Sequence, residues 1–406
     1  MVGKKNSGPF GGKMIFQIID DKKECTGVFV NGKIEHRKVG EDLTATWGYN
    51  PLLETMDIEF ASLYCDGLNL DDACPEHLKE RWKARKGKIH SFLRSFVNSK
   101  VNIDDVCFYD LVPFRHLAHY YNLKNEITEY VVKNTPRPKN YSFLFDTTIT
   151  TREIAEQEVN LNWDFLKPRY LKDPKAKSIW DRFYGTTPCV DYNIFGTKTG
   201  RLGLKEGSFP ILNFKKELRS AIIPKWGSFV ELDYNAAEVR TLLSLSGQPQ
   251  PQEDIHEWNI TNVFANEKSR DDAKRSFLAW LYNPNSNAIE TEFYDRTAVL
   301  RKYYKDGHVE TPFGRSIESD DFHALNYLLQ SCSSDNCITQ VNKIHRYLRH
   351  LKTSVAFIIH DSVVLDMPYE ERHILPQIIE IFEETRLGKF PCNISVGKNL
   401  GKMVRI

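Results

Sequence analysis

A short apolar run that ends in an aspartate and leads directly into a helix is the feature that most constrains this chain. The run Phe229-Val230-Glu231-Leu232 predicts a short buried strand, and Asp233 follows it. The leucines of residues 239–247 recur at helical spacing, and this segment ends at a glycine. Because burying an unpaired carboxylate is costly, we expect Asp233 to face a cleft and to hold a cation.

A second aspartate has the same kind of surroundings further along the chain. The apolar run Phe357-Ile358-Ile359 is interrupted by His360 and Asp361 and resumes at Val363-Val364-Leu365. This pattern predicts two strands joined at the His-Asp pair. Two aspartates on neighbouring strands are the ligands that a pair of divalent metal ions needs, so the sequence predicts a metal site at Asp233 and Asp361.

Composition and charge restrict the class of protein. The 406 residues allow two or three domains, and 41% hydrophobic with 27% charged residues is ordinary for a soluble globular protein. The sequence contains neither an apolar run long enough to span a membrane nor the apolar core of a signal peptide at its start. Eight scattered cysteines without a Cys-x-x-Cys pair predict a reduced, intracellular chain. With a net charge of +1, any nucleic-acid binding must come from local patches.

Two segments have the composition of such patches, and each also has a plainer explanation. Residues 75–100 predict a basic helix with interleaved aromatic residues, which suits either a solvated face over a small core or a surface that follows DNA phosphates. A later predicted helix places four residues on one face at steps of four: Arg270, Lys274, Leu278 and Tyr282. That row suits a triphosphate at one end and a base at the other, although an amphipathic surface helix would also show it.

The N-terminal region contains weaker signals. Residues 14–37 predict a hairpin of two strands joined by a polar turn. Asp57-Ile58-Glu59 superficially matches the paired carboxylates of a proofreading exonuclease, but a spaced Asp-x-Glu is common by chance. Asp110 and Asp146 are poorly supported as further members of such a set. We therefore expect no working exonuclease.

A series of short motifs follows in a fixed order within roughly residues 186–406. They are Thr199-Gly200-Arg201-Leu202; Asp233-Tyr234-Asn235-Ala236-Ala237-Glu238-Val239-Arg240; Asp254-Ile255-His256 with Val263-Phe264; Arg270, Lys274 and Tyr282; Val309-Glu310-Thr311-Pro312-Phe313-Gly314-Arg315; Leu325-Asn326-Tyr327-Leu328-Leu329-Gln330-Ser331; and His360-Asp361-Ser362. Together they resemble family A DNA polymerases, the group of bacterial DNA polymerase I and many phage replicases. The second motif is similar to the family's motif A (Asp-Tyr-Ser-Gln-Ile-Glu-Leu-Arg), the fourth to motif B and the last to motif C (His-Asp-Glu). So many ordered matches are very unlikely to arise by chance.

The resemblance implies an α+β fold of the right-hand type, with an antiparallel palm sheet, a helical fingers insertion and a small N-terminal thumb-like region. The implied divisions are residues 1–185 for the N-terminal region, which has room for a degenerate exonuclease-like element, 186–255 for the first part of the palm, 256–305 for the fingers and 306–406 for the second part of the palm. The first 185 residues are too few for a full exonuclease domain and an ordinary thumb. We therefore expect a reduced thumb with an extra small N-terminal element.

The resemblance also implies a role for single residues. Two Mg²⁺ ions, which Mn²⁺ can replace, would be held by Asp233, Asp361 and the backbone carbonyl of Tyr234. The dNTP would be bound by Arg270, Lys274 and His256 at its triphosphate, with Lys274 also catalytic, and by Tyr282 and Leu278 near the nascent base pair. Glu238 would crowd the 2′ position of the sugar and favour deoxyribonucleotides. Primer and template would be contacted by Arg201, Arg315, Asn326, Gln330 and His360.

Three residues depart from the family pattern. Ser362 stands where motif C has glutamate, which should weaken the organisation of metal or water but leaves both aspartates in place. Leu278 stands where motif B has Phe or Tyr, which affects sugar discrimination, and Asn283 replaces the glycine after Tyr282. The fingers are also short.

The resulting prediction is a template-directed DNA polymerase that extends a primer 3′-hydroxyl by two-metal phosphoryl transfer, without 3′–5′ proofreading. Its expected partners are primer-template DNA and dNTPs, with no membrane, and its expected location is the cytoplasm of a bacterium or of a phage-infected host. Two alternatives stay open. One is a specialised repair or gap-filling polymerase of low processivity, and the other is a non-catalytic nucleic-acid-binding remnant of a polymerase.

Overall fold

The computed structural model describes residues 13–406 apart from 20–26, 37–38, 41, 54, 103–105 and 284, with only the backbone at 108 and 109. The chain divides into two compact units, Met1–Phe145 (unit 1) and Asp146–Ile406 (unit 2). Each unit combines helices with a sheet, as the predicted α+β class requires. None of the described helices is long and apolar enough to cross a membrane.

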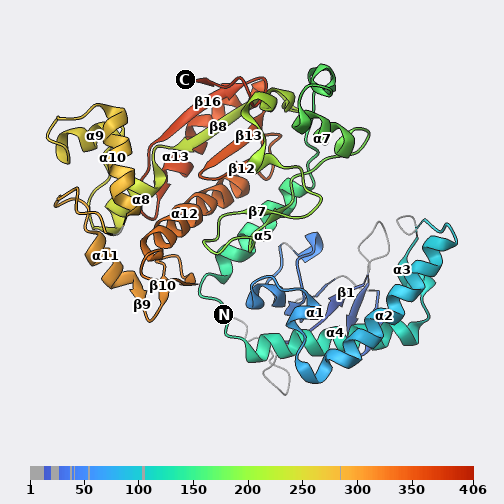
Figure 1. Ribbon diagram of the computed structural model, residues 1–406. Coiled ribbons are helices and arrows are strands. Elements are labelled where there is room, and N and C mark those ends of the chain that lie inside the picture. The colour runs from blue at the N-terminus through green and yellow to red at the C-terminus, as the bar shows by residue number, and fades with distance from the viewer. Residues whose placement is uncertain are drawn as a thin grey trace, which may run out of the picture. The chain divides into compact units, whose positions relative to one another are not determined.

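Unit 1 joins short strands to two long helices (Figure 1). The strands are β1 (Gln17–Ile18), β2 (Val28–Val30), β3 (Lys33–Glu35), β4 (Ala45–Thr46) and β5 (Glu59–Phe60); the helices are α1 (Leu70–Ala73), α2 (Glu76–Asn98), α3 (Phe108–Leu111) and α4 (Phe114–Asn134), with 3₁₀ turns at Pro51–Leu53 and Ala61–Cys65. Strands β1, β2 and β3 form an antiparallel sheet, whereas β4 and β5 pair in parallel. Helices α2 and α4 pack through stacked rings of Trp82 and Tyr120, with centroids 5.2 Å apart.

The predicted hairpin of residues 14–37 is wrong in one respect. Its second strand, predicted over residues 27–34, is itself a hairpin, because β2 and β3 turn back on each other at Asn31 and Gly32. Both turn residues have positive φ, of 50° and 75°, which is the conformation that an Asn-Gly pair adopts in a two-residue hairpin. The polar turn predicted over residues 20–26 lies outside the described residues.

The cysteines also differ from expectation. Cys107 is disulfide-bonded, whereas the scattered cysteines predicted a fully reduced chain. Spacing along the sequence does not reveal which thiols meet in space, so this bond had no sequence signal. Six other cysteines, at positions 65, 74, 189, 332, 337 and 392, have free thiols.

The basic helix predicted over residues 75–100 is α2 (Glu76–Asn98), and a role of its basic residues in following DNA phosphates stays a prediction. Leu78, Trp82 and Ile89 are buried along one side, as a helix over a small core requires. Arg81 pairs with Glu126 of α4, and the remaining basic residues of α2 are mostly exposed.

A five-stranded antiparallel sheet in the order β12-β13-β8-β16-β17 forms the centre of unit 2. Its strands are β8 (Ser228–Tyr234), β12 (Ser354–Ile359), β13 (Ser362–Met367), β16 (Cys392–Gly397) and β17 (Val404–Arg405). The two predicted aspartate segments are neighbours in this sheet, since Ser362 lies opposite Asp233. Successive side chains of a strand point to opposite faces, so Leu232 and Tyr234 lie on one face while Glu231 and Asp233 lie on the other.

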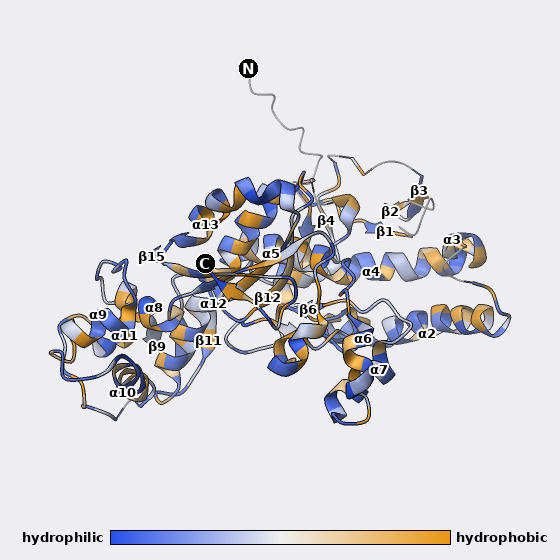
Figure 2. Ribbon diagram, turned by 90° about the horizontal axis from the view of Figure 1, so that it is seen from above, coloured by the Kyte–Doolittle hydropathy of each residue, from blue (hydrophilic) through white to orange (hydrophobic). Residues whose placement is uncertain are grey.

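Helices cover the apolar face of this sheet. Figure 1 shows α12 (Ala324–Leu348) and α13 (Leu375–Glu383) running alongside the strands, and Figure 2 shows the apolar residues of β12 and the apolar stripe of α13. The Tyr234 ring stacks on Phe382 of α13 with centroids 4.1 Å apart, and its hydroxyl donates to the Phe382 carbonyl at 2.5 Å. This packing places Asp233 on the face of the sheet opposite to α13.

The remaining elements of unit 2 extend from the sheet. Helices α8 (Ala237–Leu245), α9 (Ile255–Asn262), α10 (Arg270–Tyr282) and α11 (Arg296–Tyr303) follow β8, and the strands β9 (Tyr304–Lys305), β10 (His308–Glu310) and β11 (Ser316–Glu318) form a small sheet before α12. The preceding part contains α5 (Tyr141–Ala155, which begins in unit 1), α6 (Trp163–Leu166), α7 (Pro174–Phe183), β6 (Tyr192–Asn193) and β7 (Gly203–Leu204), with 3₁₀ turns at Lys167–Arg169, Ile211–Asn213 and Lys216–Ala221. A 3₁₀ turn at Tyr369–Ile374 precedes α13, and β14 (Glu384–Thr385) and β15 (Gly388–Lys389) follow it.

Candidate active site

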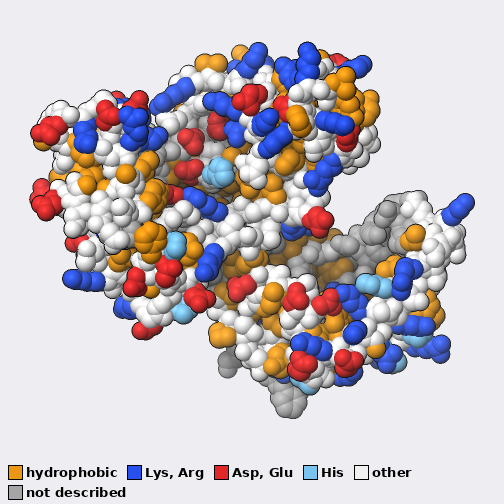
Figure 3. All heavy atoms as spheres, in the orientation of Figure 1, with side chains coloured by type: hydrophobic (Ala, Val, Ile, Leu, Met, Phe, Trp, Pro, Cys, Tyr) orange, Lys and Arg blue, Asp and Glu red, His pale blue; other side chains and the backbone are white. Residues whose placement is uncertain are grey.

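The two predicted aspartates meet at one end of the central sheet. Strands β12 and β13 are joined by the tight turn His360-Asp361, in which His360 has a φ of +58°. Because Ser362 is paired with Asp233, the turn places Asp361 beside Asp233, and the Tyr234 amide lies 3.5 Å from the Asp361 carbonyl oxygen. Figure 3 shows acidic side chains gathered in a hollow between this end of the sheet and helices α9 and α10.

Asp233 lies in an excess of negative charge. Burial raises the pKa of the Asp233 carboxyl to about 7, and the neighbouring carboxylates of Asp361 and Glu231 contribute to the rise. A hydrogen bond with Asn393 and the charge of Arg405 oppose it only in part. A divalent cation would relieve this repulsion, and carboxylate oxygens are the donors that Mg²⁺ prefers, so the residues present fit such an ion. Within the described ranges, however, no group of three or more acidic, histidine or cysteine side chains is arranged to hold a metal.

Ser362, which departs from motif C, is turned toward its own hairpin. Its hydroxyl donates to the Ile359 carbonyl at 3.0 Å, and the residue is buried. The Tyr234 side chain is buried on the helix-covered face, so its hydroxyl does not point toward Asp233.

Helix α10 presents the predicted row of four residues on its open face. Arg270, Lys274 and Tyr282 are exposed and Leu278 is half-buried, whereas Ala273, Phe277, Trp280 and Leu281 are buried on the opposite side. The Phe277 ring packs on Tyr294 with centroids 4.7 Å apart. The amphipathic pattern thus orients the cationic row away from the core.

Asp254 connects this helix to Asn235, the residue that follows β8. Its carboxylate accepts from Arg270 at 2.6 Å and from the Asn235 amide at 2.9 Å, and it caps α9 through the backbone amides of His256 and Glu257. Burial alone would raise the pKa of Asp254, but the hydrogen bonds from Arg270 and Asn235 hold it well below its usual value. The sequence analysis recognised Asp254 only as part of a short motif, since a pairing 16 positions away leaves no local signal.

His256 is buried beside the cationic row. Burial lowers its pKa to about 4, and the charges of Lys274 and Arg270 contribute to the lowering against the opposing charge of Asp254. The imidazole is therefore neutral at pH 7. Its Nδ1 atom is buried and, within the described part of the chain, has no hydrogen-bond partner.

Glu238 is held by an ion pair. It lies in the first turn of α8, and its carboxylate bonds to the guanidinium of Arg201. Burial raises the pKa of Glu238; the Arg201 charge opposes this rise and the Asp361 charge adds to it. Arg201, Glu238 and the paired aspartates thus belong to one electrostatic cluster.

The other residues predicted to contact DNA lie in different settings. The Gln330 amide donates to Asn326 at 2.6 Å along α12, and His360 is exposed in its turn. Arg315 is largely buried and binds Asp335 through two hydrogen bonds.

Sequence reasoning missed the role of Arg240, the last residue of motif A. Its side chain is fully buried, and its guanidinium donates to the carbonyls of Asn235, Pro251 and Glu253 at 2.6–2.9 Å. These bonds fasten the loop that leads from α8 to Asp254. Arg240 therefore fixes the path of the chain between the aspartate strand and α9.

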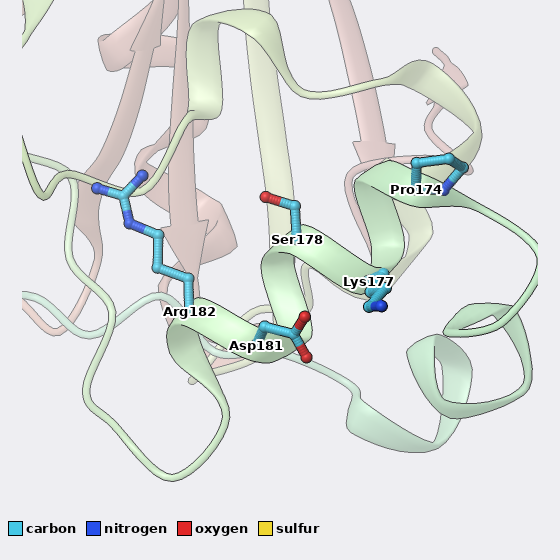
Figure 4. Close-up of a pocket in the computed structure, with 5 residues that line it drawn as sticks. All are labelled: Pro174, Lys177, Ser178, Asp181 and Arg182. Atoms are coloured by element: carbon cyan, nitrogen blue, oxygen red, sulfur yellow. The ribbon is translucent and has the colours of Figure 1, made fainter.

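The acidic residues considered for an exonuclease are not gathered in the same way. Glu59 pairs with Lys13 and Arg137 and accepts from the Tyr64 hydroxyl at 2.7 Å. Asp57 and Asp110 are exposed, and Asp146 pairs with Arg346 at 2.6 Å. An open depression elsewhere, lined by Pro174, Lys177, Ser178, Asp181 and Arg182, is formed by successive turns of α7 alone (Figure 4) and contains none of the predicted site residues.

Comparisons with known proteins find DNA polymerases, the class that the sequence motifs resemble. No family model matches the chain. DNA polymerase I of Caldicellulosiruptor bescii is 21% identical over 260 residues, which are 50% of this chain and 31% of that protein. The DNA polymerase of Bacillus phage SP01 is 22% identical over 288 residues, which are 52% of this chain and 31% of that protein.

A solved structure shares the fold. The POL domain of Pol1 from M. smegmatis, in complex with DNA primer-template and dNTP, superposes with a TM-score of 0.59 at 13% identity and covers 90% of this chain and 87% of that one. The fold is thus that of a polymerase domain, and in sequence the chain is similar to DNA polymerase I and to a phage DNA polymerase. The chain spans about a third of the length of the curated relatives that it matches.

Proposed function

We propose that this chain is a template-directed DNA polymerase that adds dNTPs to a primer 3′-hydroxyl by two-metal phosphoryl transfer. The observation that supports this most is the proximity of Asp361 to Asp233 at the end of one antiparallel sheet, where burial and neighbouring carboxylates raise the pKa of Asp233 to about 7. Surplus negative charge of this kind is what a cation site needs. The exposed row of α10 supplies the complementary positive charge for a triphosphate.

In this proposal Asp233, Asp361 and the backbone carbonyl of Tyr234 hold two Mg²⁺ ions, which Mn²⁺ can replace. When bound, the ions lower the pKa of the primer hydroxyl and neutralise charge on the phosphates. Arg270 and Lys274 bind the triphosphate, and neutral His256 donates a hydrogen bond to it. Tyr282 and Leu278 border the nascent base pair.

The domain roles follow from this assignment. Residues 186–255 and 306–406 form the palm, 256–305 the fingers and 1–185 a thumb-like N-terminal region. Glu238 restricts the 2′ position of the incoming sugar. Arg201, Asn326, Gln330 and His360 contact primer and template. We further propose that the chain does not proofread, which is supported by the pairing of Glu59 with Lys13 and Arg137.

A specialised gap-filling enzyme is a second candidate within the same chemistry. The observation that favours it is the short fingers region, with α9, α10 and α11 of 8, 13 and 8 residues. Such an enzyme would add few nucleotides per binding event. The length distribution of products under single-encounter conditions separates it from a processive replicase.

Extension of a labelled primer on a DNA template with Mg²⁺ and dNTPs tests the proposal. The intact chain should extend the primer, whereas Asp233→Asn and Asp361→Asn should not. Asp164→Asn, at an exposed position of α6, is the matched control and should extend normally. Tight primer-template binding by the intact chain without any extension would contradict the enzyme and support a non-catalytic binding protein.

A further inference from the structure

The backbone of Gly200 lies against the guanidinium of Arg315, so close that a side chain at residue 200 would clash with it. Its φ is +77°, and a Cβ built on it would lie 2.4 Å from Cζ and 2.5 Å from Nη2 of Arg315. A contact below 3.0 Å is far inside van der Waals distance, so the Arg315 group packs directly on the Gly200 backbone. The Ser334 hydroxyl also donates to the Gly200 carbonyl at 3.3 Å.

Arg315 is held in place by a buried carboxylate. Its Nε and Nη2 atoms donate to the two oxygens of Asp335 at 3.0 and 2.8 Å. The Arg315 side chain is 14% exposed and that of Asp335 is fully buried in α12. A two-pronged bond of this kind fixes the plane of the guanidinium as well as its position. The support for Gly200 is therefore rigid.

The next residue after Gly200 is Arg201, which pairs with Glu238. The Thr197 hydroxyl donates to the Arg201 carbonyl at 2.7 Å, and the Gly200 amide donates to the Thr197 carbonyl at 3.2 Å. These bonds close the loop at residues 197–201. The direction in which Arg201 leaves the loop thus depends on where Arg315 holds Gly200.

We propose that Asp335 and Arg315 are positioning residues for sugar selection, which act through Gly200 and Arg201 on Glu238. This inference rests on the proposed polymerase function. Glu238 is a flexible side chain, and a carboxylate that is free to rotate could move aside or accept a hydrogen bond from a ribose 2′-hydroxyl. Because the Glu238 carboxylate is bound to Arg201, it cannot rotate away or accept a hydrogen bond from the 2′-hydroxyl, and it excludes that group sterically.

A departure from motif B makes this support necessary. Leu278 of α10 stands where motif B has an aromatic residue, so sugar selection falls more heavily on Glu238. The family resemblance implies that Arg315 contacts DNA, and its largely buried pair with Asp335 gives it a structural role as well. A residue that only binds DNA would affect dNTP and rNTP incorporation equally, which separates the two roles.

Arg315→Lys tests the proposal because lysine keeps the positive charge but can neither make the bidentate hydrogen bond to Asp335 nor pack a planar group on Gly200. The measured quantity is the ratio of kcat/KM for a dNTP to kcat/KM for the matching rNTP. We expect this ratio to fall about tenfold or more, which corresponds to about 1.4 kcal/mol. Arg346→Lys, at an exposed ion pair on the same helix as Asp335, should leave it unchanged. Both rates come from one preparation, so loss of folded protein cancels.

Gly200→Ala provides a second variant that leaves the Asp335–Arg315 residues intact, and it should lower the ratio in the same direction. In a Glu238→Ala background, neither Arg315→Lys nor Gly200→Ala should change the ratio further, because the group they position is gone. Additive effects in that background, or an unchanged ratio in the single variants, would overturn the positioning role while the polymerase function stands. Failure of the intact chain to incorporate any nucleotide would overturn both.

Discussion

Two acidic groups of this molecule have similar residue types and opposite electrostatic surroundings. In unit 1, Glu59 is matched by the cations Lys13 and Arg137. In unit 2, Asp233 is surrounded by the carboxylates of Asp361 and Glu231, and its pKa is raised to about 7 by burial and by these charges. A carboxylate with balanced charge contributes to the fold, whereas a surplus of carboxylates stores repulsion that a bound cation can relieve.

The largest effect should appear in catalysis. Asp233→Asn is expected to reduce the rate of primer extension by at least about 1000-fold, since it removes a charged metal ligand with little change in shape. Glu59→Gln should change extension by less than about twofold, because its charge serves the fold of unit 1. Single-turnover extension of a labelled primer measures both. A comparable loss in the two variants would remove the distinction between the two groups.

Stability should respond to pH at Asp233 in a defined direction. The folded-state pKa is about 7 and the unfolded value is about 3.9, so the folded chain retains this proton over that window while the unfolded chain has lost it. The free energy of unfolding therefore falls as pH rises from about 4 to 7, and the whole loss is present above pH 7. A pKa difference of this size corresponds to a loss of at most about 4 kcal/mol, and the partial exposure of the carboxylate reduces the expected loss to about 2 kcal/mol.

Denaturant titrations in EDTA measure this effect. Asp233→Asn should be more stable than the parent by about 2 kcal/mol at pH 8 and about equal to it near pH 4, because the amide cannot ionise. Asp164→Asn is the control for loss of an exposed aspartate and should follow the parent at both pH values. A variant that is less stable than the parent at pH 8 would show that Asp233 contributes to the fold as Glu59 does.

The parts of this site that sequence reasoning recovered are those with a local pattern. Apolar runs predicted the strands before Asp233 and around His360-Asp361, and the step of four predicted the exposed face of α10. The pairings of Arg201 with Glu238, Arg270 with Asp254 and Arg315 with Asp335 join separate segments and leave no periodic signal. They form only when the chain has folded, and they decide which of the recognised charges are available to a substrate.

The same limit explains the errors in unit 1. The run 27–34 is apolar enough for one strand, but Asn31-Gly32 in its middle favours a tight turn. An Asp-x-Glu spacing was visible, whereas the pairing of Glu59 with Arg137 was not. Hydrophobic pattern therefore locates elements well, and turn chemistry and long-range pairing decide what those elements do.

Binding of Mg²⁺ alone should separate the two acidic groups without any substrate. At a concentration about tenfold above its Kd, an ion bound only to the folded state stabilises it by about 1.4 kcal/mol. Thermal unfolding at pH 8 should show this gain in the parent and in Glu59→Gln, and Asp361→Asn should lose it. A gain that survives in Asp361→Asn would place the ion elsewhere in the chain.

The smallest effect concerns the balanced group itself. Glu59→Gln removes the partner of Lys13 and Arg137 and weakens the bond from the Tyr64 hydroxyl, so we expect a loss of about 1 kcal/mol in the free energy of unfolding. Glu76→Gln is the matched control, since the exposed pair of Glu76 with Lys79 should contribute almost nothing. Urea titrations at pH 7 resolve the difference. A gain in stability in Glu59→Gln would mean that Glu59, like Asp233, is kept at a cost to the fold, and unit 1 would then merit a direct search for metal binding.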